Sequence, residues 1–233
     1  MENQQKAKRI IDTLTGPWEK RNLPKMAAAL PRWVSSDHLT ILGIIAAIVI
    51  SLGYILTWYS SWWLMLANFG FLLHWWADSL DGTLARVRHE EREQYGYFVD
   101  HICDAFSTVI ILMAFGFSPL MRLDVGLFLA IGYLMLNIYA HVGAYSEGIF
   151  RLSYAKLGPT EVRILVVIVN TILIFWNPVV FVLNQNPWTV IDIAGGLMAS
   201  LFLAAFVIVS IIDALKLDRI DRAKRDLSKN TAR

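Results

Sequence analysis

The chain has one cysteine among its 233 residues, Cys103, so it cannot form an intramolecular disulfide. It is also poor in charge: 17% of its residues are charged, and the formal net charge is only +2. That balance gives no reason to expect a nucleic-acid-binding surface. Residues 1–16 lack the apolar core and cleavage site of a signal peptide, and no repeat or low-complexity tract is apparent.

Apolar residues, in contrast, make up 56% of the chain, and the mean hydropathy is +0.50. Soluble domains are less apolar and interrupt their apolar runs sooner. We therefore predict an all-α, polytopic membrane protein. Six runs come near the roughly 20 residues needed to cross a bilayer. These predicted spans are Leu39–Trp58, Trp62–Leu84, Tyr97–Phe117, Val125–Tyr145, Ile164–Leu183 (with a kink at Pro178) and Ile193–Ile212.

Three regions follow from this pattern: residues 1–34, a transmembrane domain of six helices at 35–215, and a polar tail at 216–233. In the first region, apolar residues recur at helical spacing among basic ones. This favours an amphipathic helix at the membrane interface, broken by Gly16-Pro17 and Pro24, over a solvated basic tail. The apolar positions are Ile10, Ile11, Leu14 and Trp18.

The positive charges predict the orientation. Of the 21 Lys and Arg residues, 20 fall on one side of a six-span topology, and only Arg122 falls on the other. The positive-inside rule then puts both termini in the cytoplasm. The expected location is a bacterial inner membrane or an internal eukaryotic membrane, with membrane lipids surrounding the protein.

Four aspartates lie within residues 78–104. Asp78 and Asp81 are three residues apart at the end of the second span, and Asp100 and Asp104 are four apart at the start of the third. Either spacing puts two carboxylates on one helix face, and acidic residues are costly in a membrane. Carboxylates brought together need cations, and Mg²⁺ or Mn²⁺ suits oxygen ligands. We predict a site for two divalent ions that clamp a diphosphate near the cytoplasmic surface.

The residues between these aspartates also suit a phosphate site. Gly82 allows a ligand to approach closely, Ala85 keeps the helix slim, and Arg86 can pair with a phosphate. Gly96 would let the chain pass tightly before the third span. The alternative is that the small residues serve helix packing, while the aspartates pair with arginines in the same stretch, Arg86, Arg88 and Arg92.

The string D-x-x-D-G-x-x-A-R, nine more residues, and G-x-x-x-D-x-x-x-D resembles the signature of the CDP-alcohol phosphotransferase family. All eight fixed positions are present: Asp78, Asp81, Gly82, Ala85, Arg86, Gly96, Asp100 and Asp104. Six helices, cytoplasmic termini and an amphipathic N-terminal piece are also features of that family. The resemblance therefore extends over nearly the whole chain.

The resemblance implies roles for these positions. Asp78, Asp81 and Asp100 would be metal ligands, and Asp104 a fourth ligand or the base. The CDP moiety would be bound by Gly82, Ala85, Arg86 and Gly96. The implied reaction is attack of a hydroxyl on the phosphorus of a CDP-linked alcohol, releasing CMP in phospholipid biosynthesis. Family members are often dimers, so a homodimer is an expected partner.

The string Asp100-His101-x-Cys103-Asp104 resembles the choline- and ethanolaminephosphotransferase branch. That branch transfers from CDP-choline or CDP-ethanolamine to diacylglycerol or a similar neutral lipid. His101 would either deprotonate the lipid hydroxyl or only orient a neighbouring carboxylate. The alternative within the family is a CDP-diacylglycerol donor with a soluble acceptor such as inositol, glycerol phosphate, serine or choline. An intramembrane prenyltransferase and a metal transporter are more distant alternatives.

Other polar residues near the membrane give weaker signals. Thr160 is placed to N-cap the fifth span. Glu161 and Arg163 could reach a substrate, or they could serve only to cap the helix. Among the membrane histidines, His74 is the one close in sequence to the acidic site. His141 lies one turn from Asn137, and such histidines more often satisfy helix–helix hydrogen bonds than bind ligands.

Overall fold

The computed structural model describes residues 8–10, 13–147, 149–151, 158–183 and 185–231. Helices dominate these residues, as the apolar runs predict. In chain order the elements are β1 (Lys8–Ile10), α1 (Gly16–Ala28), α2 (Ser36–Leu56), the 3₁₀ turn η1 (Ser61–Trp63), α3 (Leu64–Arg88), α4 (Glu93–Phe117), α5 (Leu123–Glu147), β2 (Ile149–Arg151), α6 (Pro159–Phe175), β3 (Val179–Leu183), β4 (Asn186–Thr189) and α7 (Val190–Thr231).

Four of the six predicted spans are confirmed as helices long and apolar enough to cross a membrane. Within the described residues these stretches are Ser36–Leu56, Glu93–Phe117, Leu123–Gly143 and Val190–Ala223. Helix α3 has 25 residues, but its last turns carry charges. Helix α6 has only 17 residues, about 25 Å of helix. Membrane crossing by α3 and α6 therefore remains a prediction.

The predicted boundaries of the fifth span are wrong. Helix α6 begins at Pro159, and its N-cap is Gly158 rather than Thr160. It ends at Phe175, and the backbone of Trp176 is already extended. The cause is Pro178, which disfavours helical backbone at the preceding residue, Asn177. The chain does not kink at Pro178 and continue, but forms the antiparallel β3–β4 hairpin before α7.

The N-terminal helix lies later than predicted. Residues Lys8–Ile10 form a strand that pairs in parallel with β2, and Ile11 lies outside the described residues. Gly16-Pro17 starts α1 instead of breaking it, with proline in the first turn, where its missing N–H costs little. Pro24 lies inside α1, and the helix continues past it. Burial of its neighbour Leu23 and of Ala27 favours the continued helix.

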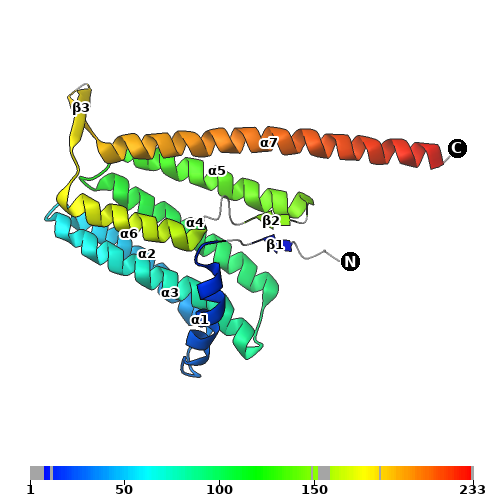
Figure 1. Cartoon of the computed structure of the whole chain (residues 1–233), viewed down its shortest axis with the longest axis horizontal. Coiled ribbons are helices and arrows are strands. Elements are labelled where there is room, and N and C mark those ends of the chain that lie inside the picture. Colours follow the sequence, from blue (N-terminus) through cyan, green and yellow to red (C-terminus); the bar gives the residue numbers. More distant parts are fainter. Residues whose placement is uncertain (1–7, 11–12, 148, 152–157, 184, 232–233) are drawn as a thin grey trace.

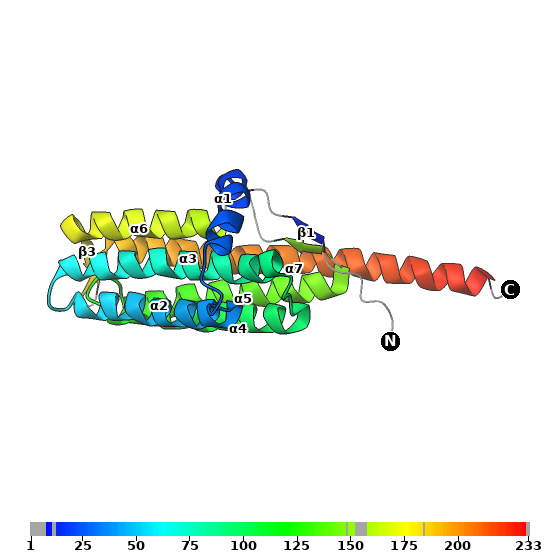
Figure 2. The ribbon, with the colours of Figure 1, turned by 90° about the horizontal axis from the view of Figure 1, so that it is seen from below.

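The long helices pack side by side in the order α6, α3, α2, α4, α5, α7. Figure 2 shows that they run roughly along one direction. Small residues allow the closest approaches. A Cβ on Gly53 of α2 would lie 2.6 Å from the Ala67 backbone nitrogen of α3. Helix α7 packs mainly on α5 and then continues beyond the other helices, so the predicted polar tail is helical as far as Thr231, the last described residue (Figure 1).

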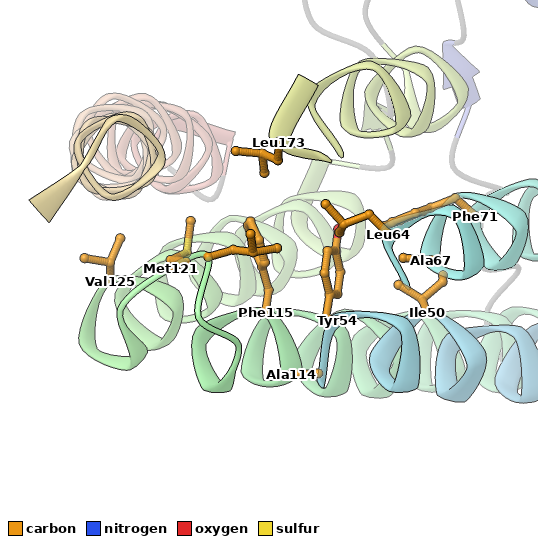
Figure 3. Close-up of a cluster of buried hydrophobic side chains, with 11 residues drawn as sticks. Ile50, Tyr54, Leu64, Ala67, Phe71, Ala114, Phe115, Met121, Val125 and Leu173 are labelled. Carbon is orange, nitrogen blue, oxygen red and sulfur yellow. The ribbon is translucent and has the colours of Figure 1, made fainter. Parts of the chain in front are cut away.

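Two apolar clusters occupy opposite ends of the bundle. The larger one joins five helices near the hairpin, and Tyr54 and Phe115 pack at its centre with ring centroids 4.6 Å apart (Figure 3). The smaller one packs α1 onto α2 and α3. Its buried residues are Leu23, Ala27, Leu39, Leu80 and Leu84. The acidic stretch lies at this second end, so α1 is held close beside it.

Candidate active site

Three of the four aspartates converge between α3 and α4. Carboxylate oxygens of Asp78, Asp100 and Asp104 all lie within 4.8 Å of one another, and each of the three residues is partly buried. The i, i+3 and i, i+4 spacings thus turn both acidic faces toward each other. Asp81 stands slightly apart and accepts hydrogen bonds from its neighbour Gly82 and from Thr40 Oγ1 at 3.1 Å.

The donor set and the space fit a hard divalent cation. A cavity of about 20 Å³ is lined by all four aspartates. That is room for one small ion or water, for which roughly 10–15 Å³ is needed. Oxygen donors in such a cluster are the ligands that Mg²⁺ and Mn²⁺ prefer.

Arg163 of α6 forms an ion pair with Asp78, a contact that the sequence did not predict. Its Nη2 donates to Asp78 Oδ2 at 2.6 Å, and both side chains are more than three-quarters buried. The sequence placed Arg163 only within reach of a substrate. The available signal was a lone arginine near the start of an otherwise apolar helix, facing the same side of the membrane as the aspartates.

A larger pocket of about 270 Å³ adjoins the aspartates. It lies between the starts of α2 and α4, the end of α3 and the α3–α4 loop. All four residues predicted to bind the CDP moiety line it: Gly82, Ala85, Arg86 and Gly96. Asp81 and Asp100 line both this pocket and the small acidic cavity. A ligand in the pocket would therefore reach the carboxylates directly.

The two glycines differ in surroundings. A Cβ on Gly82 would lie 3.4 Å from Arg86 Nη1, so the missing side chain leaves room beside that guanidinium. A Cβ on Gly96 would meet no described atom within 4 Å. The prediction that Gly96 lets the chain pass tightly is therefore wrong, because Gly96 lies in the first turn of α4 beside open space.

The three arginines near the aspartates have other partners. Arg86 Nη2 donates to Thr83 Oγ1 at 3.0 Å, and Arg92 pairs with Asp37 at the pocket wall. Arg88 donates to backbone carbonyls of the α1–α2 connection, including Pro31 at 2.9 Å. The alternative that these arginines neutralise the four aspartates is not supported by these contacts.

His101 lies beside the acidic cluster. Its Nδ1 is 3.8 Å from Asp100 Oδ2, longer than a hydrogen bond. Its ring packs edge-on against Tyr97 and lies 4.4 Å from the ring of His141 on α5. His74, the other suspected histidine, is buried and lines the acidic cavity.

Glu161 serves as a structural cap. Its carboxylate accepts hydrogen bonds from Gly158 N at 3.0 Å, Thr15 N at 2.7 Å and Thr15 Oγ1 at 2.9 Å. Thr160, which is not the N-cap, donates to Glu19 Oε1 of α1 at 2.6 Å. These bonds tie α1 to the start of α6, the helix that carries Arg163.

Comparison with protein families gives a match. The family model described as CDP-alcohol phosphatidyltransferase matches residues 33–212, about three-quarters of the chain and all of the site described above. None of the curated proteins matches the chain.

Proposed function

Since the chain belongs to the CDP-alcohol phosphatidyltransferase family, we propose that it transfers a phosphoaminoalcohol group from CDP-choline or CDP-ethanolamine to a neutral lipid hydroxyl. Membership makes the chain a transferase of substituted phosphate groups that acts in phospholipid synthesis. The choice of donor and acceptor is our proposal. It is supported by the D-H-x-C-D string at residues 100–104.

One observation carries the reaction type. Asp81 and Asp100 form a wall shared by the pocket of about 270 Å³ and the acidic cavity. A CDP-alcohol bound in the pocket would put its nucleotide beside Gly82, Ala85 and Gly96, and its diphosphate next to the carboxylates. Small residues at those positions leave the helix backbone open to a bulky ligand.

We assign Asp78, Asp81, Asp100 and Asp104 as the residues that hold Mg²⁺ or Mn²⁺. When bound, divalent ions would neutralise the diphosphate and stabilise the departing CMP. Arg163 offsets part of the negative charge of Asp78. The pocket residues Gly82, Ala85 and Gly96 would hold the nucleotide of the donor so that the phosphorus bearing the aminoalcohol faces the acceptor.

The step balances as a simple displacement. The acceptor oxygen forms a bond to the phosphorus that carries the aminoalcohol, and the bond from that phosphorus to the bridging oxygen breaks. CMP leaves with the bonding electrons, and the hydroxyl proton passes to Asp104 or His101. The product is a phosphodiester lipid.

A donor panel tests the substrate assignment. Purified protein in lipid nanodiscs is given CDP-choline, CDP-ethanolamine or CDP-diacylglycerol, each with diacylglycerol or a soluble alcohol, and CMP release is measured with Mg²⁺ or Mn²⁺. We expect turnover with a CDP-aminoalcohol and diacylglycerol. Turnover only with CDP-diacylglycerol and a soluble alcohol would overturn the proposal and favour the other branch of the family.

The two remoter alternatives predict different outcomes. A prenyltransferase would release diphosphate from a prenyl donor, and a transporter would move metal across a vesicle membrane without CMP release. Both acidic pairs of this chain lie within 27 residues, near one end of the bundle. A transport site would be expected near the bilayer midplane, with exits to both sides.

A further inference from the structure

Helices α4 and α5 interact differently along their lengths. At the end near the hairpin they touch through glycines, since a Cβ on Gly126 would lie 3.1 Å from Gly116 Cα. Such close small-residue contact is sufficient to hold two membrane helices together. At the other end, a Cβ on Gly143 would meet no described atom within 4 Å. There the facing side chains are polar instead of small.

We name these side chains the polar seam: Tyr97, His101 and Thr108 of α4, and Tyr133, Asn137 and His141 of α5. The α5 members are each four residues apart, so they share one helix face. Tyr133 lies close to Thr108 and Asn137. Tyr97 Oη and His141 Nδ1 are 2.9 Å apart.

The polar seam begins at the candidate active site. His101 lies 3.8 Å from the Asp100 carboxylate, and it is three residues before Asp104 on the same helix. Its ring lies 4.4 Å from the ring of His141 on α5, so hydrogen-bonding groups from both helices begin within one turn of Asp104. A hydroxyl held in the seam would be close to the carboxylate proposed to take its proton.

The seam contains no Lys, Arg, Asp or Glu and is bordered by apolar side chains, and the nearby cation, Arg163 of α6, is already paired with Asp78. No Lys or Arg occurs in Glu93–Phe117 or Leu123–Glu147, so these helices offer a phosphorylated acceptor no counter-ion of their own. Large apolar side chains on the same two helices are more than half exposed: Phe98, Ile102 and Phe106 of α4, and Ile138 and Val142 of α5. Polar groups beside apolar surface match a molecule with one hydroxyl end and acyl chains.

We propose that the polar seam is the acceptor subsite, and that it takes an uncharged lipid alcohol of the diacylglycerol class. The lipid enters sideways between α4 and α5, its acyl chains lie against the exposed apolar side chains, and its hydroxyl end is positioned by Tyr133, Asn137 and His141. This inference rests on the proposed function, because it supplies the acceptor for that reaction.

A kinetic test compares two variants of the seam with a tyrosine variant at the other end of the bundle. Tyr133→Phe and Asn137→Leu alter the seam away from Tyr97, which also lines the donor pocket. Tyr54→Phe instead removes a 3.0 Å bond to Asn170 in the apolar cluster at the other end. The seam variants are expected to raise KM for diacylglycerol about tenfold, the effect of one to two hydrogen bonds, with KM for the CDP donor unchanged. Tyr54→Phe should lower Tm and leave both KM values unchanged.

The seam assignment would be overturned if the seam variants changed KM for diacylglycerol and KM for the CDP donor equally, or changed neither. Turnover by the wild type would still support the proposed function in that case. A binding measurement separates the two further, because it needs no turnover. A diacylglycerol bearing a photoactivatable acyl chain should label α4 and α5, and unlabelled diacylglycerol should compete. Labelling confined to other helices would overturn the seam even in a protein that is fully active.

Discussion

At the scale of single residues, the Arg163–Asp78 pair controls the charge of the acidic site without metal. We predict that Arg163→Met destabilises the protein by about 3 kcal/mol in EDTA, because it leaves a largely buried carboxylate cluster with no cation. Bound Mg²⁺ should restore most of the loss. Apparent Tm by intrinsic fluorescence, with EDTA and with Mg²⁺, measures the effect.

A matched control exists on α7. Arg222→Met breaks the Arg222–Asp218 pair, whose two side chains are more than half exposed. Exposed pairs contribute little, so its Tm should hardly change in either condition. If Arg163→Met and Arg222→Met behaved alike in EDTA, Arg163 would not balance the acidic site.

The sequence was sufficient for the site residues that lie on helices consecutive in the chain. Helical spacing predicts that Asp78, Asp100 and Asp104 can converge, and a local pattern marks Gly82 and Ala85 as pocket residues. Contacts between residues far apart in the chain have no fixed sequence spacing. The Arg163–Asp78 pair spans 85 residues and the Thr40–Asp81 bond spans 41, so neither could be read from a local pattern.

At the scale of helices, the glycines of the bundle are of two kinds: some allow two helices to pack closely, and others line the pocket. Gly53→Ala puts a methyl group 2.6 Å from the α3 backbone and should destabilise the protein by about 1–3 kcal/mol. Gly96→Ala adds the same group to open space beside the pocket, so Tm should stay the same or rise slightly. The methyl group should instead raise KM for the CDP donor at least about fivefold.

Thermal unfolding and donor kinetics of these two variants check the distinction. A large Tm loss in Gly96→Ala, with donor KM unchanged, would mean that Gly96 serves helix packing. An unchanged Tm in Gly53→Ala would contradict the tight α2–α3 contact.

Helix existence was more predictable than helix ends. Long apolar runs predict all six long helices, since periodic burial and length are properties of the run itself. The end of α6 depended on Asn177-Pro178 and on hairpin pairing between β3 and β4, which links residues across a turn. The strand at Lys8–Ile10 was missed because its partner, β2, lies about 140 residues away.

At the scale of the whole molecule, the bundle has two distinct ends. Apolar packing and exposed tryptophans such as Trp58 and Trp62 mark the end near the hairpin, and the aspartates mark the other. Tryptophans at one level favour a membrane interface there. Together with the distribution of Lys and Arg, this supports our proposal that the acidic end and both termini face the cytoplasm.

Labelling of single cysteines tests that orientation. Two variants in a Cys103→Ser background each carry one exposed thiol. Asp124→Cys puts it near the start of α5, and Lys229→Cys puts it near the end of α7, at the opposite end of the molecule. A membrane-impermeant maleimide should label the first in intact cells and the second only in inverted vesicles. The reverse pattern would contradict the cytoplasmic assignment.

The central claim is that the four aspartates support metal-dependent transfer from a CDP-alcohol, and CMP release tests it most directly. With CDP-ethanolamine and diacylglycerol, EDTA should abolish release and Mg²⁺ or Mn²⁺ should restore it. Asp100→Asn should lower the rate about a hundredfold or more at every metal concentration, while Asp124→Asn, an exposed aspartate outside the site, retains it. Substantial CMP release by a folded Asp100→Asn variant, or release by the wild type in EDTA, would contradict the account.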